Sequence, residues 1–121
     1  MFKKKVLKYS KYVNRQKELQ RAITLLDEQE LYSPATQIMW VSIRSLIFYY
    51  LEEKRIDFNS TQEAILLFIS NQDSIDVKCS IYNVYTSSIL IEWDINTSMT
   101  KNEYEMFKQN CLTIKETISN D

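Results

Sequence analysis

The sequence contains no glycine and no histidine, and its one proline is Pro34. A phosphate-binding loop needs glycines, because only a residue without Cβ lets successive backbone N–H groups approach the phosphates. The P-loop and the dinucleotide fingerprint are therefore excluded. Histidine is the usual general base near neutral pH and the commonest metal ligand, so its absence excludes Ser-His-Asp and Cys-His nucleophile systems and histidine-ligated metals. We expect no catalytic residues, no metal site and no cofactor.

The lack of glycine also favours helices over strands, because tight hairpins usually need residues at positive φ. The chain has 121 residues, enough for one domain with its own hydrophobic core. The sequence therefore predicts a single all-α domain over residues 1–121, built as a bundle of four to five helices.

Cysteine is scarce: Cys79 and Cys111 have no CxxC spacing, and we expect two buried thiols in a reducing cytosol. A disulfide or a redox pair is the alternative. The basic start of the chain continues into a stretch too charged for the apolar part of a secretory signal. The most apolar stretch, residues 38–51, is too short to span a membrane and contains Arg44. These features predict a cytoplasmic protein that does not enter membranes.

Three sequence signals mark the starts of helices. Residues 60–63 (Ser-Thr-Gln-Glu) and 100–103 (Thr-Lys-Asn-Glu) are capping boxes, in which a hydroxyl caps the helix and the glutamate reaches back. Ser33 is expected to cap the helix that begins at Pro34, where the missing N–H has no cost.

These signals divide the chain into helical segments. A first helix begins between Lys3 and Ser10 and ends near Glu30, and a second runs from Pro34 to about Lys54. The second is apolar nearly all the way round, which is typical of a central helix covered on several sides. A short helix covers about residues 61–70. The last helix carries one apolar stripe: Met106, Phe107, Cys111, Ile114 and Ile118.

Residues 75–95 fit two kinds of structure. As a helix capped by Asp73, the segment aligns Val77, Ile81, Val84, Ser88, Ile91 and Ile95 on one stripe. As a strand, apolar residues alternate from Ile89 to Ile95, and the stretch is rich in β-branched side chains. We favour a helix, because a lone hairpin would lack a glycine turn and a third strand. A short β segment within residues 75–95 is the alternative.

The order of these elements resembles a HEPN domain, the all-helical module named for higher eukaryotes and prokaryotes nucleotide-binding. The likeness lies in the layout. A long helix ends in residues 25–32 (Leu-Leu-Asp-Glu-Gln-Glu-Leu-Tyr), and residues 33–36 (Ser-Pro-Ala-Thr) lead into a long apolar helix. The short Ser60-capped helix and two further helices, separated by residues 96–100, complete it.

One departure from that family bears on activity. Active HEPN ribonucleases carry an arginine followed four to six residues later by a histidine, near the start of the penultimate helix. This chain has no histidine, and its last arginine is Arg55. The resemblance therefore implies a degenerate member that is not a ribonuclease. It also implies a dimer that binds a nucleotidyltransferase partner or a nucleic acid, with a toxin–antitoxin or phage-defence role.

Charge is segregated along the chain. Seven basic residues precede the first acidic residue, Glu18, although the net charge is −1. Together with the aromatic residues between them, residues 1–17 are a candidate phosphate-binding segment, and the same pattern also fits a solvated helix that keeps the protein soluble. Candidate contacts to nucleic acid or to an acidic partner are Lys3, Lys4, Lys5, Lys8, Lys11 and Arg15.

Arg44 is unusual because a permanent charge in an apolar helix must be paired or must reach water. We expect it to snorkel or to pair with a carboxylate such as Glu63, Glu92 or Asp94, or else to serve an interface. The abundant tyrosines suit either core packing or a recognition surface. The candidate interface residues are Trp40, Arg44, Tyr49 and Tyr50.

The sequence thus predicts a non-catalytic binding protein. Our first hypothesis is a HEPN-like interaction subunit or inhibitor that acts through helix surfaces on another protein, as a homodimer. The alternative is a nucleic-acid-binding protein that uses its basic N-terminal helix.

Overall fold

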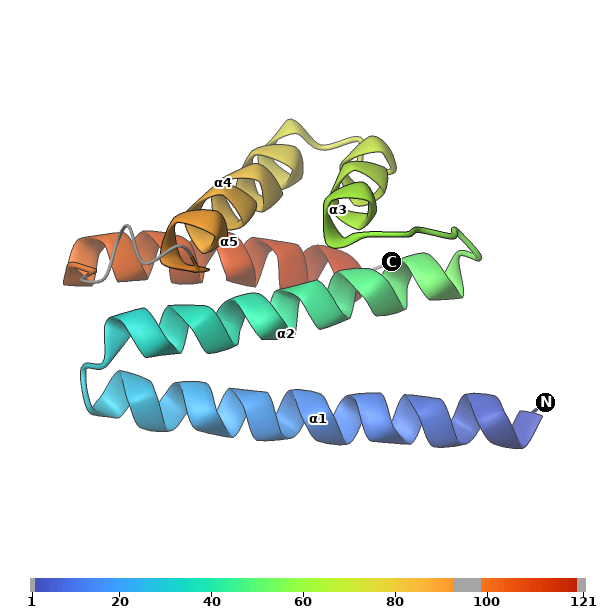
Figure 1. Cartoon of the computed structure of the whole chain (residues 1–121), viewed down its shortest axis with the longest axis horizontal. Helices are drawn as coiled ribbons and strands as arrows, with labels where there is room; N and C mark the ends of the chain where they lie inside the picture. Colours follow the sequence, from blue (N-terminus) through green and yellow to red (C-terminus); the bar gives the residue numbers. More distant parts are fainter. Residues whose placement is uncertain (1, 93–98, 120–121) are drawn as a thin grey trace.

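The computed structural model describes the backbone of residues 2–92 and 99–119, and the side chains of residues 11–90 and 99–119. The described residues form helices and no strand, which confirms the all-α prediction. No helix in the described ranges has both the length and the apolar character needed to cross a bilayer. The helices are α1 (Phe2–Glu28), α2 (Tyr32–Glu53), α3 (Thr61–Ser70), α4 (Ile75–Glu92) and α5 (Lys101–Ser119) (Figure 1).

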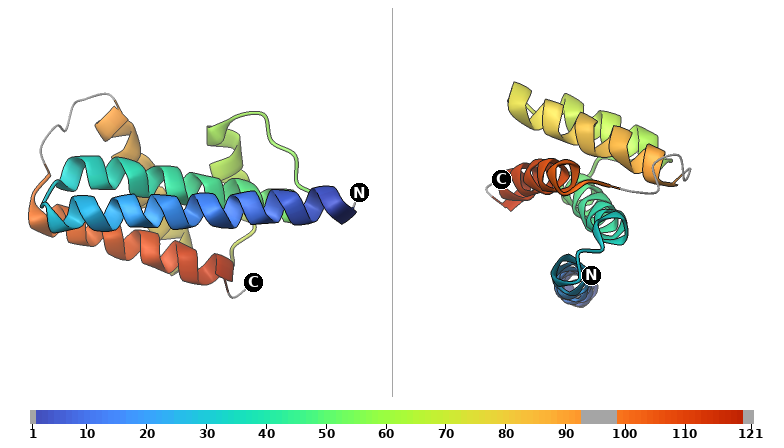
Figure 2. Two further views of the ribbon diagram at one scale, coloured as in Figure 1. Left: turned by 90° about the horizontal axis from the view of Figure 1, so that it is seen from below. Right: turned by 90° about the vertical axis from the view of Figure 1, so that its left-hand side faces the viewer.

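Helix α2 lies at the centre of the bundle. It packs against α1, α3, α4 and α5, whereas α1 packs closely against α2 alone among the described helices. Figure 2 shows α1 at one side of the molecule, with α2 between it and the α3–α4 pair. The prediction of a central helix covered on several sides is confirmed, because an apolar surface that surrounds a helix is buried only when neighbours cover each side.

The core forms around this helix. Ile43, Ile47 and Leu51 of α2 are fully buried, and the other helices surround them with apolar side chains. These are Ala64, Ile65 and Phe68 of α3, Val77, Ile81 and Val84 of α4, and Tyr104, Phe107, Cys111 and Ile114 of α5. Helix α1 contributes Ile23. Met106, predicted in the α5 stripe, is instead 68% exposed, because its neighbour Phe107 takes the buried position.

Two of the predicted helix starts are confirmed in atomic detail. The Glu63 N–H donates to Ser60 Oγ at 3.1 Å, and the Glu63 carboxylate accepts from the Asn59 N–H. At α5 the box is reciprocal: the Glu103 N–H donates to Thr100 Oγ1 at 3.2 Å, and the Thr100 N–H donates to Glu103 Oε1 at 3.3 Å. These bonds satisfy N–H groups that have no partner within the helix.

The predicted cap at Ser33 is wrong. Helix α2 begins at Tyr32, and Leu31 occupies the N-cap position without a side-chain bond. The helix begins earlier than predicted because the turn after α1 is tight and leads directly into α2. At this start the Tyr32 ring stacks on Tyr104, with the ring centroids 4.7 Å apart. Pro34 therefore lies inside the first turn, where its missing N–H is still harmless.

The segment from residue 75 to residue 92 is a helix, which rules out a strand there. Val77, Ile81, Val84 and Ser88 are buried along the predicted stripe, and the remainder of the 75–95 segment, residues 93–95, lies outside the described residues. The predicted cap Asp73 is wrong by one residue, because the Val77 N–H points to Ser74 Oγ at 3.4 Å. Asp73 and Ser74 are adjacent capping residues, and the sequence does not choose between them.

The described residues include two glycine-type turns made without glycine. Glu30 and Arg55 have positive φ values of 57° and 58°. The Leu31 N–H bonds to Leu26 O and the Ile56 N–H to Leu51 O, both at 2.9 Å, which is the Schellman pattern that ends a helix. Because Cβ crowds the backbone in this region, each residue costs about 1–2 kcal/mol relative to glycine.

We therefore predict that Glu30→Gly and Arg55→Gly each raise the free energy of unfolding, by roughly 0.5–1 kcal/mol after the larger entropy of the unfolded chain is counted. Urea unfolding at neutral pH measures it. The matched control, Glu18→Gly, replaces an exposed residue in the interior of α1 and should lower stability by about 1 kcal/mol. Destabilisation by both turn variants would contradict this account.

Candidate functional site

The basic candidates all lie on helix α1. Lys11 and Arg15 are exposed and stand four residues apart, on one face of the helix. The side chains of Lys3, Lys4, Lys5 and Lys8 lie outside the described residues. The two candidates with described side chains, Lys11 and Arg15, therefore lie on a solvent-facing helix surface.

The candidate interface residues on α2 separate into different surroundings. Trp40 is 4% exposed and packs against the Tyr85 ring at 5.9 Å, so it belongs to the core of the monomer. Tyr49 stacks on Tyr12 of α1 with centroids 4.2 Å apart, and Tyr50 meets Phe68 edge to face. These rings join helices within the chain.

Arg44 is half-buried on the stripe of α2 between Trp40 and Phe48. One of its expected partners, Glu63, accepts a hydrogen bond from the Asn59 N–H at the start of α3. Asp94 and the side chain of Glu92 lie outside the described residues. The structure thus places Arg44 at partial depth, as snorkelling requires.

A groove that sequence reasoning missed lies between α4 and α5. It has a volume of about 370 Å³. We call it the α4–α5 groove, and its lining is Tyr82, Asn83, Thr86, Ser87, Leu90, Met99, Glu103, Met106, Phe107 and Asn110.

The apolar side chains of the α4–α5 groove are unusually open to solvent. Tyr82 is 64% exposed, Met106 is 68% exposed and Leu90 is 39% exposed. Phe107 is buried beneath them and forms the floor. Such side chains on one concave surface of a small protein are typical of an interaction site. The sequence signal was present, since Tyr82, Thr86 and Leu90 share one helical face, but a stripe does not reveal which face is left uncovered.

Local bonds fix the α5 wall of this groove. The reciprocal capping box at Thr100 sets the first residue of α5 and therefore the positions of Glu103 and Met106. Met99 precedes it and is tied to the central helix, because Thr36 Oγ1 of α2 donates to Met99 Sδ at 3.1 Å. The wall residues are consequently held by the bundle itself.

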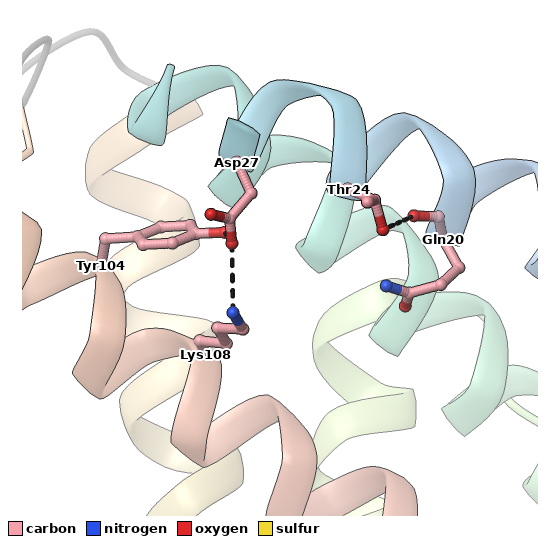
Figure 3. A network of polar contacts seen from close by, with 5 residues as sticks. All are labelled: Gln20, Thr24, Asp27, Tyr104 and Lys108. Carbon is pink, nitrogen blue, oxygen red and sulfur yellow. Dashed lines mark hydrogen bonds and ion pairs between the residues drawn. The ribbon is translucent and has the colours of Figure 1, made fainter. Parts of the chain in front are cut away.

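A polar bridge joins α1 to α5 (Figure 3). The buried Tyr104 hydroxyl donates to Asp27 Oδ2 at 2.7 Å, and Lys108 Nζ lies 3.1 Å from the same oxygen. The Tyr104 hydrogen bond, followed by that of Lys108, lowers the pKa of Asp27 below its ordinary value of 3.8. Burial, followed by the hydrogen bond to Asp27, raises the pKa of Tyr104. At neutral pH the Asp27 carboxyl is therefore ionised and the Tyr104 hydroxyl is neutral.

A second bridge ties α1 to α2. Ser42 Oγ donates to Gln16 Oε1 at 2.7 Å, and Gln16 Nε2 donates to the Ser42 carbonyl at 3.3 Å. Ser42 is buried, so the amide of Gln16 satisfies polar groups that water does not reach.

The described side chains offer few groups for metal binding or nucleophilic chemistry. The described residues hold no cluster of three or more cysteine and acidic side chains suited to a metal ion. Both cysteines are free; Cys111 is buried, but Cys79 is exposed, so the prediction of two buried thiols is wrong for Cys79. Burial raises the pKa of Cys111 to about 12, which keeps it a neutral thiol.

No protein-family model, curated protein or solved structure matches this chain.

The Asp27 bridge predicts how stability depends on pH. Because the pKa of Asp27 is lowered in the folded state, its contribution is present above pH 3.8 and is lost as pH falls through the lowered folded value. We expect Asp27→Asn to cost roughly 1 kcal/mol at neutral pH, since solvent screens part of the interaction.

Urea unfolding over a pH series measures this difference between wild type and Asp27→Asn, which should shrink in acid. The control, Glu28→Gln, changes an exposed carboxylate one residue away and should have little effect. A difference between wild type and Asp27→Asn that persists unchanged in strong acid would contradict the assignment.

Proposed function

We propose that this chain is a non-catalytic protein-interaction module, and that the α4–α5 groove receives an amphipathic helix of a partner protein. The observation that carries the proposal is the exposure of Tyr82, Leu90 and Met106 around one groove. The proposal keeps the function expected from the sequence but moves the contact surface from α2 to α4 and α5.

The lining of the groove favours a helical partner. Positions 82, 86 and 90 of α4 and positions 103, 106 and 110 of α5 recur every three or four residues, which gives one row of side chains on each helix. A groove between two such rows fits a third helix whose apolar anchors have the same spacing.

The chemistry of the lining favours an apolar helix face. Among the described residues of the groove, Glu103 is the one with a charged side chain, and it already bonds to Thr100 in the capping box. Met99 and Met106 are flexible and polarisable, so they can adapt to the side chains of a partner. Binding would therefore come mainly from apolar burial.

We predict that Met106→Lys weakens binding of the partner at least tenfold. A photo-crosslinking amino acid at position 106 identifies the partner in cells, and titration of that purified partner measures the affinity. Because Met106 is exposed, the charge should disturb the groove without unfolding the chain.

The matched control is Leu66→Lys, since Leu66 is 59% exposed on α3 and lies outside the groove. It should bind within twofold of wild type. A crosslink to a second copy of the chain would make the expected homodimer the occupant. Equal affinity of wild type and Met106→Lys would overturn the proposal.

The second candidate is a nucleic-acid-binding protein that uses α1, and the exposure of Lys11 and Arg15 favours it. In that case the affinity for nucleic acid should fall steeply as the salt concentration rises. A plot of the logarithm of the binding constant against the logarithm of the salt concentration should fall with a slope of about 0.7–0.9 per phosphate contacted. Replacing Lys3, Lys4, Lys5, Lys8 and Lys11 together by glutamine should abolish this binding.

We expect the first function to prevail, so that micromolar wild-type protein shows no salt-sensitive retention of single-stranded or duplex nucleic acid. The acidic residues from Glu18 onward repel the same phosphates that the basic segment attracts. Salt-dependent binding that the glutamine variant loses, with its thermal stability unchanged, would establish the second function instead.

A further inference from the structure

A second groove lies on the opposite side of α5 from the α4–α5 groove. Helices α1 and α5 both pack against α2, but their described backbones do not approach each other closely. The space between them is open, and we call it the α1–α5 groove. Asp27, Tyr104 and Lys108 bridge it at one end.

The α1–α5 groove has two lobes that share Gln20 and Lys115. The larger lobe, of about 350 Å³, is lined by Val13, Gln16 and Lys17 of α1, by Leu46 of α2 and by Ser119 of α5, as well as by Tyr12. The smaller, of about 140 Å³, has Ile23, Met39 and Cys111 in its lining. The combination of apolar walls with a few polar groups is typical of small-molecule sites, which begin at about 300 Å³.

The charges of the larger lobe have one sign. Its charged lining residues among those described are Lys17 and Lys115, with no carboxylate. Asp27 belongs to the far end of the groove, where Tyr104 and Lys108 already bind it. The lobe is therefore apolar in its walls and cationic at its opening.

Lys115 is the distinctive residue of this lobe. Its ammonium group donates to Gln20 Oε1 at 3.3 Å, a neutral acceptor, and it forms no ion pair within the described part of the chain. Burial lowers the pKa of Lys115. A half-buried cation with only a neutral partner is poorly compensated, and an anion placed beside it would supply the missing charge.

We propose that the α1–α5 groove binds a small amphiphilic carboxylate, with its carboxylate on Lys115 and its hydrocarbon chain along Val13 and Leu46. Lys17 adds a second, exposed cation at the opening. This site is separate from the α4–α5 groove. Binding of the carboxylate and binding of a partner protein can therefore be tested independently.

Decanoate, used below the concentration at which it forms micelles, tests the proposal by titration of the full chain followed by amide NMR. We expect saturable shifts confined to residues around Val13, Leu46 and Lys115. Decanol has the same chain without the charge and decyltrimethylammonium has the opposite charge, so both should bind at least tenfold more weakly.

Substitutions separate the contribution of the lysine charges to binding from that of the apolar walls. Lys115→Met should weaken decanoate binding at least tenfold, and Lys115→Arg should restore most of it. The control Lys101→Met removes an exposed lysine of α5 that does not line the groove and should have no effect. Because Lys17 is exposed, Lys17→Met tests the site without risk to the fold and should weaken binding about threefold.

Decanol that binds as tightly as decanoate would overturn the proposal, as would shifts scattered over the whole surface. Unchanged affinity in Lys115→Met would also overturn it. If Lys115→Met fails to fold, an unchanged affinity in Lys17→Met has the same consequence.

Discussion

The structure depends on the burial of α2 from every side. Ile43, Ile47 and Leu51 lose all contact with water only because α3, α4 and α5 cover them, and α1 closes the remaining face. Burial of an apolar side chain contributes about 1.5–3 kcal/mol, so a helix that is apolar all round is stable only at the centre of a bundle. The other helices are placed by this requirement.

Helix α1 is held differently from the rest. Among its described side chains Ile23 is the one that is buried, so polar and aromatic contacts supply much of the attachment of α1. Gln16 bonds to Ser42, Tyr12 stacks on Tyr49, and Asp27 bonds to Tyr104. Directional contacts of this kind fix the register of α1 on the bundle more than they stabilise it, because hydrogen bonds exchange for bonds to water.

The two grooves follow from the same arrangement. Helix α5 packs against α2 and α4, and both of its flanks remain partly open. On one side of α5, Tyr82 and Leu90 of α4 and Met106 of α5 are exposed to solvent. On the other side, Lys17 of α1 and Lys115 of α5 lie over apolar walls. Among the described residues the first surface carries one carboxylate, Glu103, whereas the second is cationic. Surfaces of different charge select different ligands, so the two flanks of α5 suit a partner protein and a small molecule, respectively.

The absence of glycine constrains the turns but does not prevent them. Glu30 and Arg55 adopt the left-handed conformation that glycine usually supplies, and both end a helix in a Schellman turn. Packing of Leu51 and Ile56 against the core offsets the local strain at the second turn. A composition without glycine therefore indicates helices, but it does not locate the helix ends.

The sequence by itself determined the all-α fold, the central place of α2 and the capping boxes at Ser60 and Thr100, because periodicity and capping act over only a few residues. The sequence also predicted the buried stripe of α4, although periodicity alone did not exclude a strand in that segment. Tertiary structure decided the remainder: Trp40 became core, Met106 became exposed, and α2 began at Tyr32 and not after Ser33. The α1–α5 groove arises where two helices distant in sequence flank α2, and the α4–α5 groove lies between consecutive helices. In neither case does a local pattern specify which flank stays open.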